Sequence, residues 1–354
     1  MTLELRNVTK CVGAETHIHE TSLTLMDHGF NILLGTTLSG KTTLMQLMAG
    51  LEQPTTGEVW FKGRNVTGVP VQKRNVAMVY QQFINYANFS VFENIASPLR
   101  VARLGSAEVA ARVNEIADLL QLTPMLQRRP SELSGGQQQR TALARALVKD
   151  SGLVLLDEPL ANLDFKLREE LREQLPKLFA DRACTVVYAT TEPIEALLLG
   201  GHTAALHEGR VTQFGATCDI YRRPLDLLTA QVFSETPINT AEVRKSGDKV
   251  TLTSDIEWNV SGAQAQLPDG TYRIGIRPHH ISPFASSQDR TEIRGKVIIA
   301  ELSGSESTIR FSHQSLNWVS LSKGLHSFLL GEETAFYMSA GRCMYFNGDG
   351  KRVA

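Results

Sequence analysis

The chain has 354 residues, a length that favours two domains over one. Hydrophobic residues make up 42% and charged residues 21% of it, which is ordinary globular composition and argues against a disordered chain. The formal net charge is -1, which gives no indication of a general basic surface that would bind nucleic acid. We therefore expect no nucleic-acid partner.

The cysteines and the first ten residues indicate in which cellular compartment the protein is expected. The 4 cysteines are scattered with no pair at metal-ligand spacing, so we expect a reduced cytosolic protein with buried thiols at Cys11, Cys184, Cys218 and Cys343. Residues 1–10 alternate like a strand and lack the apolar core of a signal peptide. No apolar run approaches the roughly 20 residues of a membrane helix, so any membrane association must come through a partner.

The first part of the chain reads as an α/β core. Leu3–Val8 and Ser22–Met26 alternate as half-buried strands do. The apolar run Phe30–Leu34 ends at Gly35, and Lys41–Met48 follows with helical spacing. Short apolar runs typical of a parallel sheet follow at Val76–Tyr80, Leu153–Leu156 and Thr185–Ala189.

Helical spacing interrupts this core between about residues 82 and 148. In Ser106–Leu120 the apolar residues form a stripe on one face: Val109, Val113, Ile116, Leu119 and Leu120. Pro124 and Pro130 then mark a loop. The pattern predicts a helical insertion.

The pattern of apolar and polar residues changes again after about Phe233. Thr236-Pro237 is typical of a linker, and the remainder holds short strand-like runs separated by Gly, Ser and Asp: Val250–Thr253, Tyr272–Ile276, Lys296–Ala300, Ser307–Phe311 and Thr334–Tyr337. We therefore expect an α/β domain over residues 1–234 and a small all-β domain over 235–354.

The segment Gly35-Thr36-Thr37-Leu38-Ser39-Gly40-Lys41-Thr42 fits the pattern G-x-x-x-x-G-K-[ST] of a phosphate loop. Polyphosphate needs converging N–H donors and a positive group, and a loop that enters a helix N-terminus supplies both. Lys41 is expected to reach the outer phosphates, and the Thr42 hydroxyl to ligate magnesium. Thr43 completes the expected ATP-binding residues.

Asp157 ends a predicted buried strand, where a carboxylate is costly without a cation, so we interpret it as a direct or water-mediated Mg²⁺ ligand. Glu158 is the candidate catalytic base that orients and deprotonates the attacking water. Taken alone, Glu158 also fits an exposed loop glutamate.

A second glycine-containing segment precedes another expected helix. Leu133–Arg140 contains Ser134, Gly135 and Gly136 just before a helix expected to start near Gln137. Uncovered amides at a helix start favour an anion, although Gly-Gly by itself also fits a plain hinge. The chain's own phosphate loop already offers one anion cradle, so a second one needs a second role.

Together these motifs resemble the ATPase subunits of ABC transporters. The resemblance rests on the phosphate loop, Gln81 in Met78–Gln81, Leu133–Arg140, Leu155–Pro159 and Ala161-Asn162-Leu163-Asp164. It implies an ATPase in which two such domains pack head to tail. Each ATP is then shared between one phosphate loop and the facing subunit's signature residues, here Ser134, Gly135, Gly136 and Gln137.

The same resemblance assigns further roles. Gln81 corresponds to a glutamine that touches Mg²⁺, and Asp164 to an aspartate that crosses the dimer interface. Phe83 to Asn94 corresponds to the surface that receives the membrane subunits. Arg210–Gly215, Tyr221–Pro224 and Ile274–Pro278 resemble the sugar-importer group, whose regulatory domain is oligonucleotide-fold-like (TOBE-type). His279 stands where that group commonly has glutamate.

The chain departs from the family pattern at three positions. Val12 stands where an aromatic residue usually stacks on adenine, and loss of that stack costs roughly 1–3 kcal/mol. Thr191 replaces the switch histidine, and it cannot carry an imidazolium charge. The spacing of His202 and His207 places them on the next loop and strand, so neither is expected to substitute. Leu38 is bulky where the group often has glycine.

These departures suggest an asymmetric pair, in which this site turns over poorly and the intact Ser134–Gly136 completes a competent site on a non-identical ATPase chain. Stretches around Val12, Gln81 and Thr191 resemble ATPase subunits of bacterial glycerol importers. The expected function is to energise import of a small polyol or sugar, glycerol in the first instance. Expected partners are two permease subunits and, indirectly, a periplasmic binding protein, on the cytoplasmic face of the inner membrane.

Three alternatives stay open. The chain could be a homodimeric sugar-importer ATPase in which Glu158 suffices and Thr191 is tolerated. It could bind ATP as a regulatory or structural subunit without useful hydrolysis. A soluble ABC protein acting on DNA or ribosomes should show duplicated cassettes or a coiled-coil insertion, and the sequence has neither.

Overall fold

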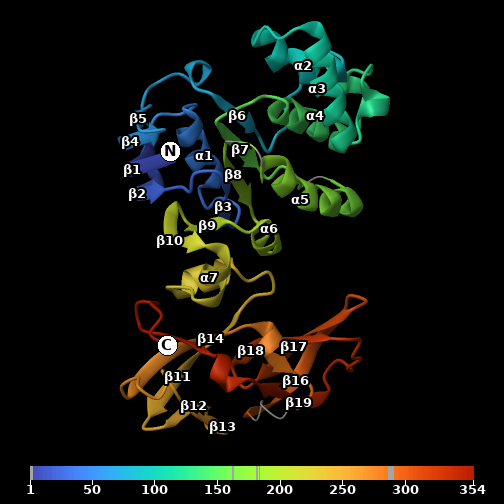
Figure 1. Ribbon diagram of the computed structural model, residues 1–354. Coiled ribbons are helices and arrows are strands. Elements are labelled where there is room, and N and C mark those ends of the chain that lie inside the picture. The colour runs from blue at the N-terminus through green and yellow to red at the C-terminus, as the bar shows by residue number, and fades with distance from the viewer. Residues whose placement is uncertain (1–2, 162, 181, 183, 286–290) are drawn as a thin grey trace. The chain divides into compact units, whose positions relative to one another are not determined.

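The computed structural model describes residues 3–161, 163–180, 182, 184–285 and 291–354. The chain divides into two compact units, Met1–Ile220 and Tyr221–Ala354 (Figure 1). The boundary expected near residue 235 stays a prediction. Each unit is described by itself below.

A six-stranded sheet forms the centre of the first unit. Its strand order is β10-β9-β3-β8-β7-β6; β9, β3, β8, β7 and β6 run parallel and β10 pairs antiparallel with β9. Every residue of β7 and β8 is buried, as expected for strands covered on both faces. The strands are β3 (Gly29–Gly35), β6 (Val76–Val79), β7 (Leu153–Asp157), β8 (Thr185–Thr190), β9 (His202–His207) and β10 (Arg210–Ala216).

A second, antiparallel sheet has the order β2-β1-β4-β5. Its strands are β1 (Leu3–Val12), β2 (Glu15–Thr24), β4 (Thr56–Phe61) and β5 (Arg64–Asn65). The strand expected at Ser22–Met26 therefore begins earlier and ends at Thr24, because it pairs along the whole of β1 across a turn at Gly13.

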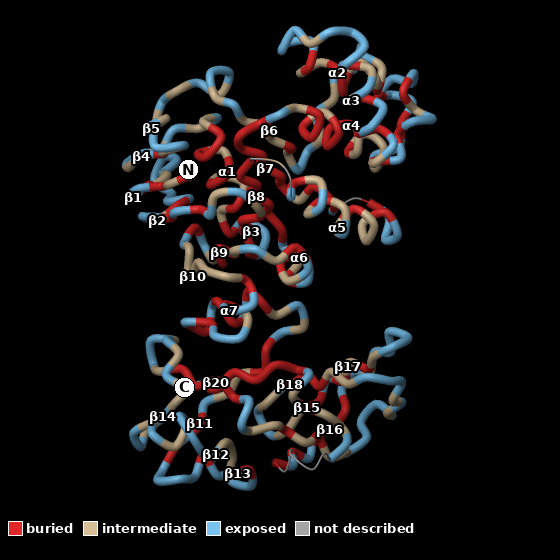
Figure 2. Tube along the Cα trace, in the orientation of Figure 1, coloured by how far each residue is buried: buried red, intermediate tan, exposed pale blue. Residues whose placement is uncertain are grey.

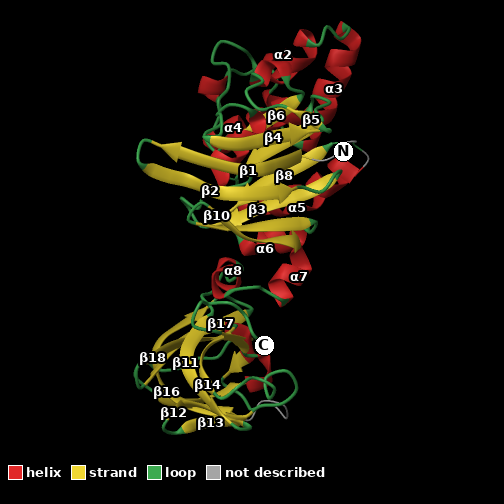
Figure 3. Ribbon diagram, turned by 90° about the vertical axis from the view of Figure 1, so that its left-hand side faces the viewer, coloured by secondary structure: helices red, strands yellow, loops and turns green. Residues whose placement is uncertain are grey.

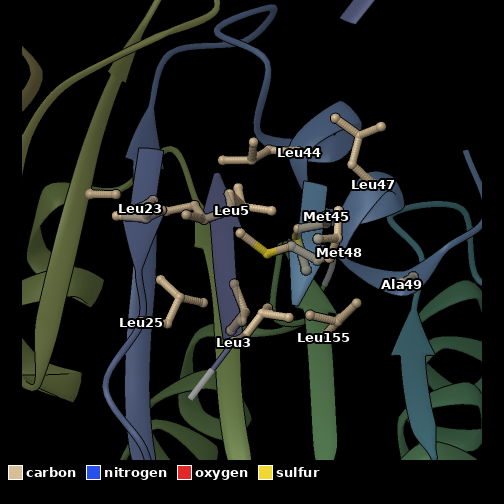
Figure 4. Close-up of a cluster of buried hydrophobic side chains, with 14 of the residues drawn as sticks. Leu3, Leu5, Leu23, Leu25, Leu44, Met45, Leu47, Met48, Ala49 and Leu155 are labelled. Carbon is tan, nitrogen blue, oxygen red and sulfur yellow. The ribbon is translucent and has the colours of Figure 1, made fainter. Parts of the chain in front are cut away.

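Helix α1 (Lys41–Ala49) lies between the two sheets. Figure 4 shows its side chains Leu44, Met45 and Met48 against Leu3 and Leu5 of β1, and all five are at most 2% exposed. Large-to-small changes in such a core typically cost 2–5 kcal/mol, so the packing fixes the helix that carries the phosphate loop.

The expected helical insertion is present as three helices, α2 (Val91–Val101), α3 (Ser106–Leu119) and α4 (Gly135–Leu147), which lie together, with α4 beside β6 (Figure 1). The apolar stripe of α3 is buried at Val109, Val113 and Ile116. Helix α4 begins at Gly135 rather than near Gln137, because Ser134 is the N-cap and the helix starts directly after it.

The first unit is completed by α5 (Phe165–Ala180) and α6 (Pro193–Leu199), and α7 (Thr217–Arg222) crosses the division between the units. Figure 2 shows that burial follows the central strands, while the outer helix faces are exposed. Short 3-10 turns occur at Val71–Lys73, Thr123–Met125 and Pro130–Glu132.

The second unit is mainly antiparallel β structure, as expected, and also holds the short helix α8 (Leu227–Val232) (Figure 3). One sheet has the order β13-β12-β11-β14-β20 and the other β15-β19-β16-β17-β18. Their strands are β11 (Asn239–Ser246), β12 (Lys249–Thr253), β13 (Ile256–Asn259), β14 (Gly270–Ile276), β15 (Ile281–Ser282), β16 (Thr291–Leu302), β17 (Glu306–His313), β18 (Leu316–Lys323), β19 (Glu333–Met338) and β20 (Met344–Phe346).

Both sheets contribute to one apolar core, in which the rings of Phe311 and Phe336 stack with centroids 3.8 Å apart. Short 3-10 turns at Pro278–His280 and Ala340–Arg342 lie between strands. The described helices include none with the length and apolar character to cross a membrane.

The cysteines are free, but the expectation that all are buried is wrong. Cys184 and Cys343 are buried, whereas Cys11 and Cys218 are exposed. Cys11 lies on β1, which pairs only with the strands of its own sheet, and Cys218 lies at the start of α7.

Candidate nucleotide site

The phosphate loop lies between the end of β3 at Gly35 and the start of α1 at Lys41. Gly40, the N-cap of α1, has φ 99°, a conformation that favours glycine. A Cβ at Gly40 would lie 2.8 Å from Ile18 Cδ1, and one at Gly35 would lie 2.6 Å from the Leu206 carbonyl oxygen. Gly40 is therefore favoured by its backbone conformation and by a close neighbour, and Gly35 by a close neighbour.

Leu38 is the strained position of this loop. Its φ is 66° and its side chain is 96% exposed. A left-handed conformation costs a residue with a Cβ about 1–2 kcal/mol, and no described packing around the exposed side chain offsets that cost. Glycine, which has no Cβ, would adopt this conformation without that cost.

Lys41 places a cation inside the loop. Its Nζ donates to the carbonyl oxygens of Gly35 at 2.8 Å and Thr36 at 3.0 Å, and lies 3.6 Å from Glu158 Oε1. The residue is only 5% exposed, and burial lowers the pKa of its ammonium group while Glu158 and Asp157 oppose that shift. The loop thus holds a poorly solvated positive charge close to its own carbonyl groups.

Asp157 and Thr42 meet beneath the loop. Thr42 Oγ1 donates to Asp157 Oδ2 at 2.7 Å, and Asp157 is 1% exposed. Burial raises the pKa of Asp157, and the Thr42 hydrogen bond only partly opposes this. A carboxylate in this position lacks sufficient positive compensation from the protein alone, as expected of a cation ligand.

Glu158 is the first residue after β7 and has φ 46°. Its backbone N–H donates to the Ala189 carbonyl at 3.0 Å, which fixes it against the end of β8. Gln81 Nε2 donates to Glu158 Oε2 at 3.1 Å. The carboxylate is therefore held between Gln81 and Lys41.

One cavity of ≈ 620 Å³ brings most of these groups together. Its walls include Thr37 to Thr43, Gln81 and Glu158, and its volume lies within the range of small-molecule sites. It is also lined by His17 and His19, which we did not single out as site residues in the sequence. Their signal was available: Ile18 between them is buried, so strand alternation turns both imidazoles to the other face.

Val12 and Thr191, which the sequence analysis expects to be degenerate, lie outside the residues that line this cavity. Val12 ends β1 and is 51% exposed, and Thr191 is exposed directly after β8. His202 and His207 are the first and last residues of β9, so both lie on the strand rather than one on a loop. The His202 ring packs near Phe214 with centroids 5.9 Å apart, and neither histidine lines the cavity.

The signature residues form a capped helix start that is separate from this cavity. Ser134 Oγ accepts the Gln137 N–H at 3.4 Å, and Gln137 Oε1 accepts the Ser134 N–H at 3.0 Å. Ser134 and Gly135 are exposed, and a Cβ at Gly135 would meet only Phe83 Cζ at 4.0 Å. The surface above this helix start is open.

Asp164 lies at the start of α5, where its Oδ1 accepts the Leu167 N–H at 3.0 Å. Asn162 of the same motif lies outside the described residues. One turn further, Arg168 pairs with Glu192 at 3.0 Å, so the segment after Asp164 is tied to the segment that contains Thr191.

Comparisons with known proteins agree with this geometry. A family model described as ABC transporter matches residues 18–161. The sn-glycerol-3-phosphate import ATP-binding protein of Escherichia coli (strain K12) is 34% identical over 345 residues, which cover 92% of this chain and 97% of that protein. The chain belongs to the ABC transporter ATPases.

Further relatives of this ABC ATPase extend the comparison. The protein of the same name from Cupriavidus necator is 33% identical, with 99% of each chain covered. A bacterial ABC transporter cassette, solved as a dimer, has a TM-score of 0.56 at 28% identity and covers 61% of this chain and 98% of its own. A dimeric cassette solved in a post-hydrolysis state with ADP and Pi has a TM-score of 0.55 at 28% identity.

In this ABC ATPase the structure brings together the phosphate loop, Gln81, Asp157 and Glu158. It does not bring the signature residues or Asp164 to that cavity within one chain. A transport ATPase whose expected site residues fall into two separate groups needs a second subunit if both groups are to contact one nucleotide.

Proposed function

We propose that this transport ATPase holds ATP and Mg²⁺ at the phosphate loop and shares the nucleotide with a facing ATPase chain. Gly35 to Thr43 would cradle the phosphates through backbone N–H groups, and Lys41 would exchange its carbonyl partners for phosphate oxygens. The relocation is favourable because two neutral acceptors at 2.8 and 3.0 Å are replaced by charged ones.

Thr42, Asp157 and Gln81 are proposed to hold the metal. Their hydroxyl, carboxylate and amide oxygens suit Mg²⁺, which takes few protein ligands and completes its shell with phosphate and water. Bound Mg²⁺ would neutralise phosphate charge. The buried Asp157 carboxylate would gain the positive partner that it lacks.

Glu158 is proposed as the group that orients and accepts a proton from the attacking water. Its Oε2 is held by Gln81 at 3.1 Å and its backbone by Ala189, so the carboxylate has one fixed side and one side toward the cavity. Glu158→Gln keeps the shape and the Gln81 contact but removes the proton acceptor, and is expected to trap bound ATP.

The observation that carries the shared-site proposal is the exposed, capped helix start at Ser134. Helix α4 has 13 residues and begins at the exposed Gly135, where a Cβ would meet only Phe83 Cζ at 4.0 Å. Such an N-terminus attracts an anion, and the chain's own cavity lies elsewhere. The dimeric arrangement of the two solved cassettes supports the same proposal.

We further propose that the pair is asymmetric and that this chain supplies the weaker phosphate-loop site. Thr191 offers no imidazole, and Val12 offers no flat ring for the base. The loop around Thr191 is built by its neighbours: Thr190 Oγ1 donates to Glu195 at 2.6 Å, and the Glu192 N–H donates to Thr190 Oγ1 at 3.0 Å. Thr191 is exposed, so a histidine can be introduced there without breaking this framework.

The test is ATP hydrolysis by the purified chain and by Thr191→His. We expect low wild-type turnover and an increase of at least tenfold in the variant, with no increase in Thr251→His, an exposed threonine of the second unit. Robust turnover of the wild-type chain without a partner would contradict the asymmetric proposal and favour the homodimer. Low turnover in both proteins would instead favour an ATP-binding regulatory subunit.

For the transported solute we propose a small polyol, with glycerol first and sn-glycerol-3-phosphate second. Glycerol rests on the resemblance around Val12, Gln81 and Thr191, whereas the phosphate ester is favoured by the names of the relatives. Uptake of each labelled solute in a deletion strain separates them. Unchanged uptake of both, with loss of another solute, would discard this assignment.

The proposal also implies partners and a location. Two permease subunits would receive the surface at Phe83 to Asn94, a periplasmic binding protein would act indirectly, and the chain would sit on the cytoplasmic face of the inner membrane. In support, Ile84, Tyr86 and Phe89 of that surface are 63%, 52% and 41% exposed, as expected of residues that bury in a complex.

A further inference from the structure

The second unit contains a cavity of ≈ 530 Å³ with a strongly basic wall. Among the described residues that line it, none is an aspartate or glutamate. The basic residues of the lining are Arg222, Arg277, Arg342, Arg352, His279 and His280. Several cations around one hollow repel each other unless an anion compensates them. None of the residues proposed to bind the nucleotide lines this cavity.

Arg277 is the buried centre of the wall, at 7% exposure. Its Nη2 donates to the Tyr221 carbonyl at 2.8 Å, and its Nη1 donates to the Phe233 carbonyl at 3.2 Å and to Ser234 Oγ at 3.1 Å. Its guanidinium also lies 3.8 Å from the Tyr221 ring centroid. These neutral partners fix its position and leave its charge uncompensated.

Arg352 has one neutral and one charged partner. Its Nη1 donates to the Arg222 carbonyl at 3.2 Å, and its Nε donates at 3.0 Å to an oxygen of Ala354, the last residue of the sequence, whose carboxylate offsets one of the four arginine charges. Burial lowers the pKa of this guanidinium, and the charge of Arg223 lowers it further. A second fixed cation therefore borders the cavity.

Arg222 and Arg342 complete the wall with free guanidinium groups. Both are exposed, and neither side chain has a hydrogen bond or ion pair to another described residue. Beside them, burial and the charge of Arg277 lower the pKa of His279. Two anchored and two free arginines thus face one hollow.

We propose that this cavity binds a small phosphate-bearing anion. Guanidinium forks match the oxygens of phosphate in bidentate geometry, and arginine is the side chain best suited to it. A volume of ≈ 530 Å³ lies within the range of small-molecule sites and leaves space for an organic group beside the phosphate. The site is distinct from the proposed nucleotide site and does not depend on it.

The His279 imidazole, which lines this cavity, provides a local readout of binding there. The full chain with labelled histidines is titrated with inorganic phosphate and with glycerol-3-phosphate, and the His279 signal is assigned from His279→Gln. We expect a saturable shift of that signal and a rise of the His279 pKa, because a bound anion offsets the charge of Arg277. Glycerol, which lacks the phosphate, should cause neither change.

Arg342→Gln and Arg222→Gln should each weaken binding about tenfold or more, since each removes a charged donor from the anion. Neither side chain has a structural contact, so both variants should keep the fold. Arg310→Gln, an exposed arginine of the same unit away from the cavity, should bind like the wild type.

The two titrants distinguish the sources of the phosphate group. A response to glycerol-3-phosphate alone assigns an ester, and a response to inorganic phosphate alone assigns the free ion; both support the proposal. A His279 signal that does not move at millimolar concentrations of either, or that moves equally in Arg342→Gln and Arg310→Gln, would overturn it.

Discussion

The buried carboxylate of Asp157 gives the sharpest stability prediction. Asp157→Asn should stabilise the nucleotide-free chain, because the amide keeps an acceptor for Thr42 but needs no buried charge. The residue is 1% exposed and its pKa is raised mainly by burial. Relief of an incompletely compensated buried charge is worth about 1–3 kcal/mol.

The pH dependence follows from the same pKa. Because burial raises the pKa of Asp157 above its ordinary value of 3.8, the folded state holds that proton more tightly than the unfolded state does. The contribution of Asp157 to the free energy of unfolding therefore falls as pH rises from 3.8 through the folded-state pKa. The advantage of Asp157→Asn over the wild type should grow across that interval and then level off.

The assay is unfolding by denaturant and heat over a pH series, without nucleotide and with ATP and Mg²⁺. For a domain of 150–250 residues, each kcal/mol moves Tm by about 2–4 °C. Glu115→Gln removes an exposed carboxylate and should change stability by less than about 0.5 kcal/mol. With ATP and Mg²⁺ the order should reverse, since only the wild type gains a metal ligand. An Asp157→Asn chain that is less stable than the wild type without ligand would refute the reasoning.

Three further substitutions test the site and its support. Gly40→Ala should cost about 1–3 kcal/mol in denaturant unfolding and weaken ATP binding, because φ is 99° and the methyl would meet Ile18; wild-type behaviour would show that the loop path is adaptable. Leu44→Ala, at 0% exposure, should cost about 2–5 kcal/mol, whereas exposed Leu198→Ala should cost little; similar losses would contradict the packing described for α1. His17→Ala should weaken fluorescent-ATP binding by about 1–3 kcal/mol if the imidazole replaces the missing aromatic residue, and an unchanged affinity would remove His17 from the base site.

The sequence was most informative where a local rule determines structure. The strand and helix that flank Gly35–Lys41, the buried strands β7 and β8 and the α3 stripe follow from turn chemistry and periodicity, and the structure confirms those elements. The N-cap at Ser134 shows the limit of such rules: the helix begins directly after the cap, two residues before the expected start.

Features that depend on distant contacts could not be predicted in this way. Thr42 and Asp157 were proposed separately, and only the pairing of strands and α1 brings their oxygens within 2.7 Å. The basic cavity is less predictable still, because Arg222, Arg277 and Arg342 stand far apart in sequence and meet only when the second unit folds. His17 and His19 alternate with Ile18 along β2, but only the folded chain brings that strand beside Gly40 of the phosphate loop.

The central claim is that Ser134 of this chain serves a nucleotide held by another subunit. The most direct measurement is ATP hydrolysis by the intact transporter carrying Ser134→Ala or Lys41→Ala in this chain alone. Denaturant unfolding of the Ser134→Ala chain is the folding control, because the substitution removes a capping box of α4. The account predicts that Ser134→Ala abolishes most hydrolysis while Lys41→Ala spares most of it. Loss with Lys41→Ala and retention with Ser134→Ala would contradict it.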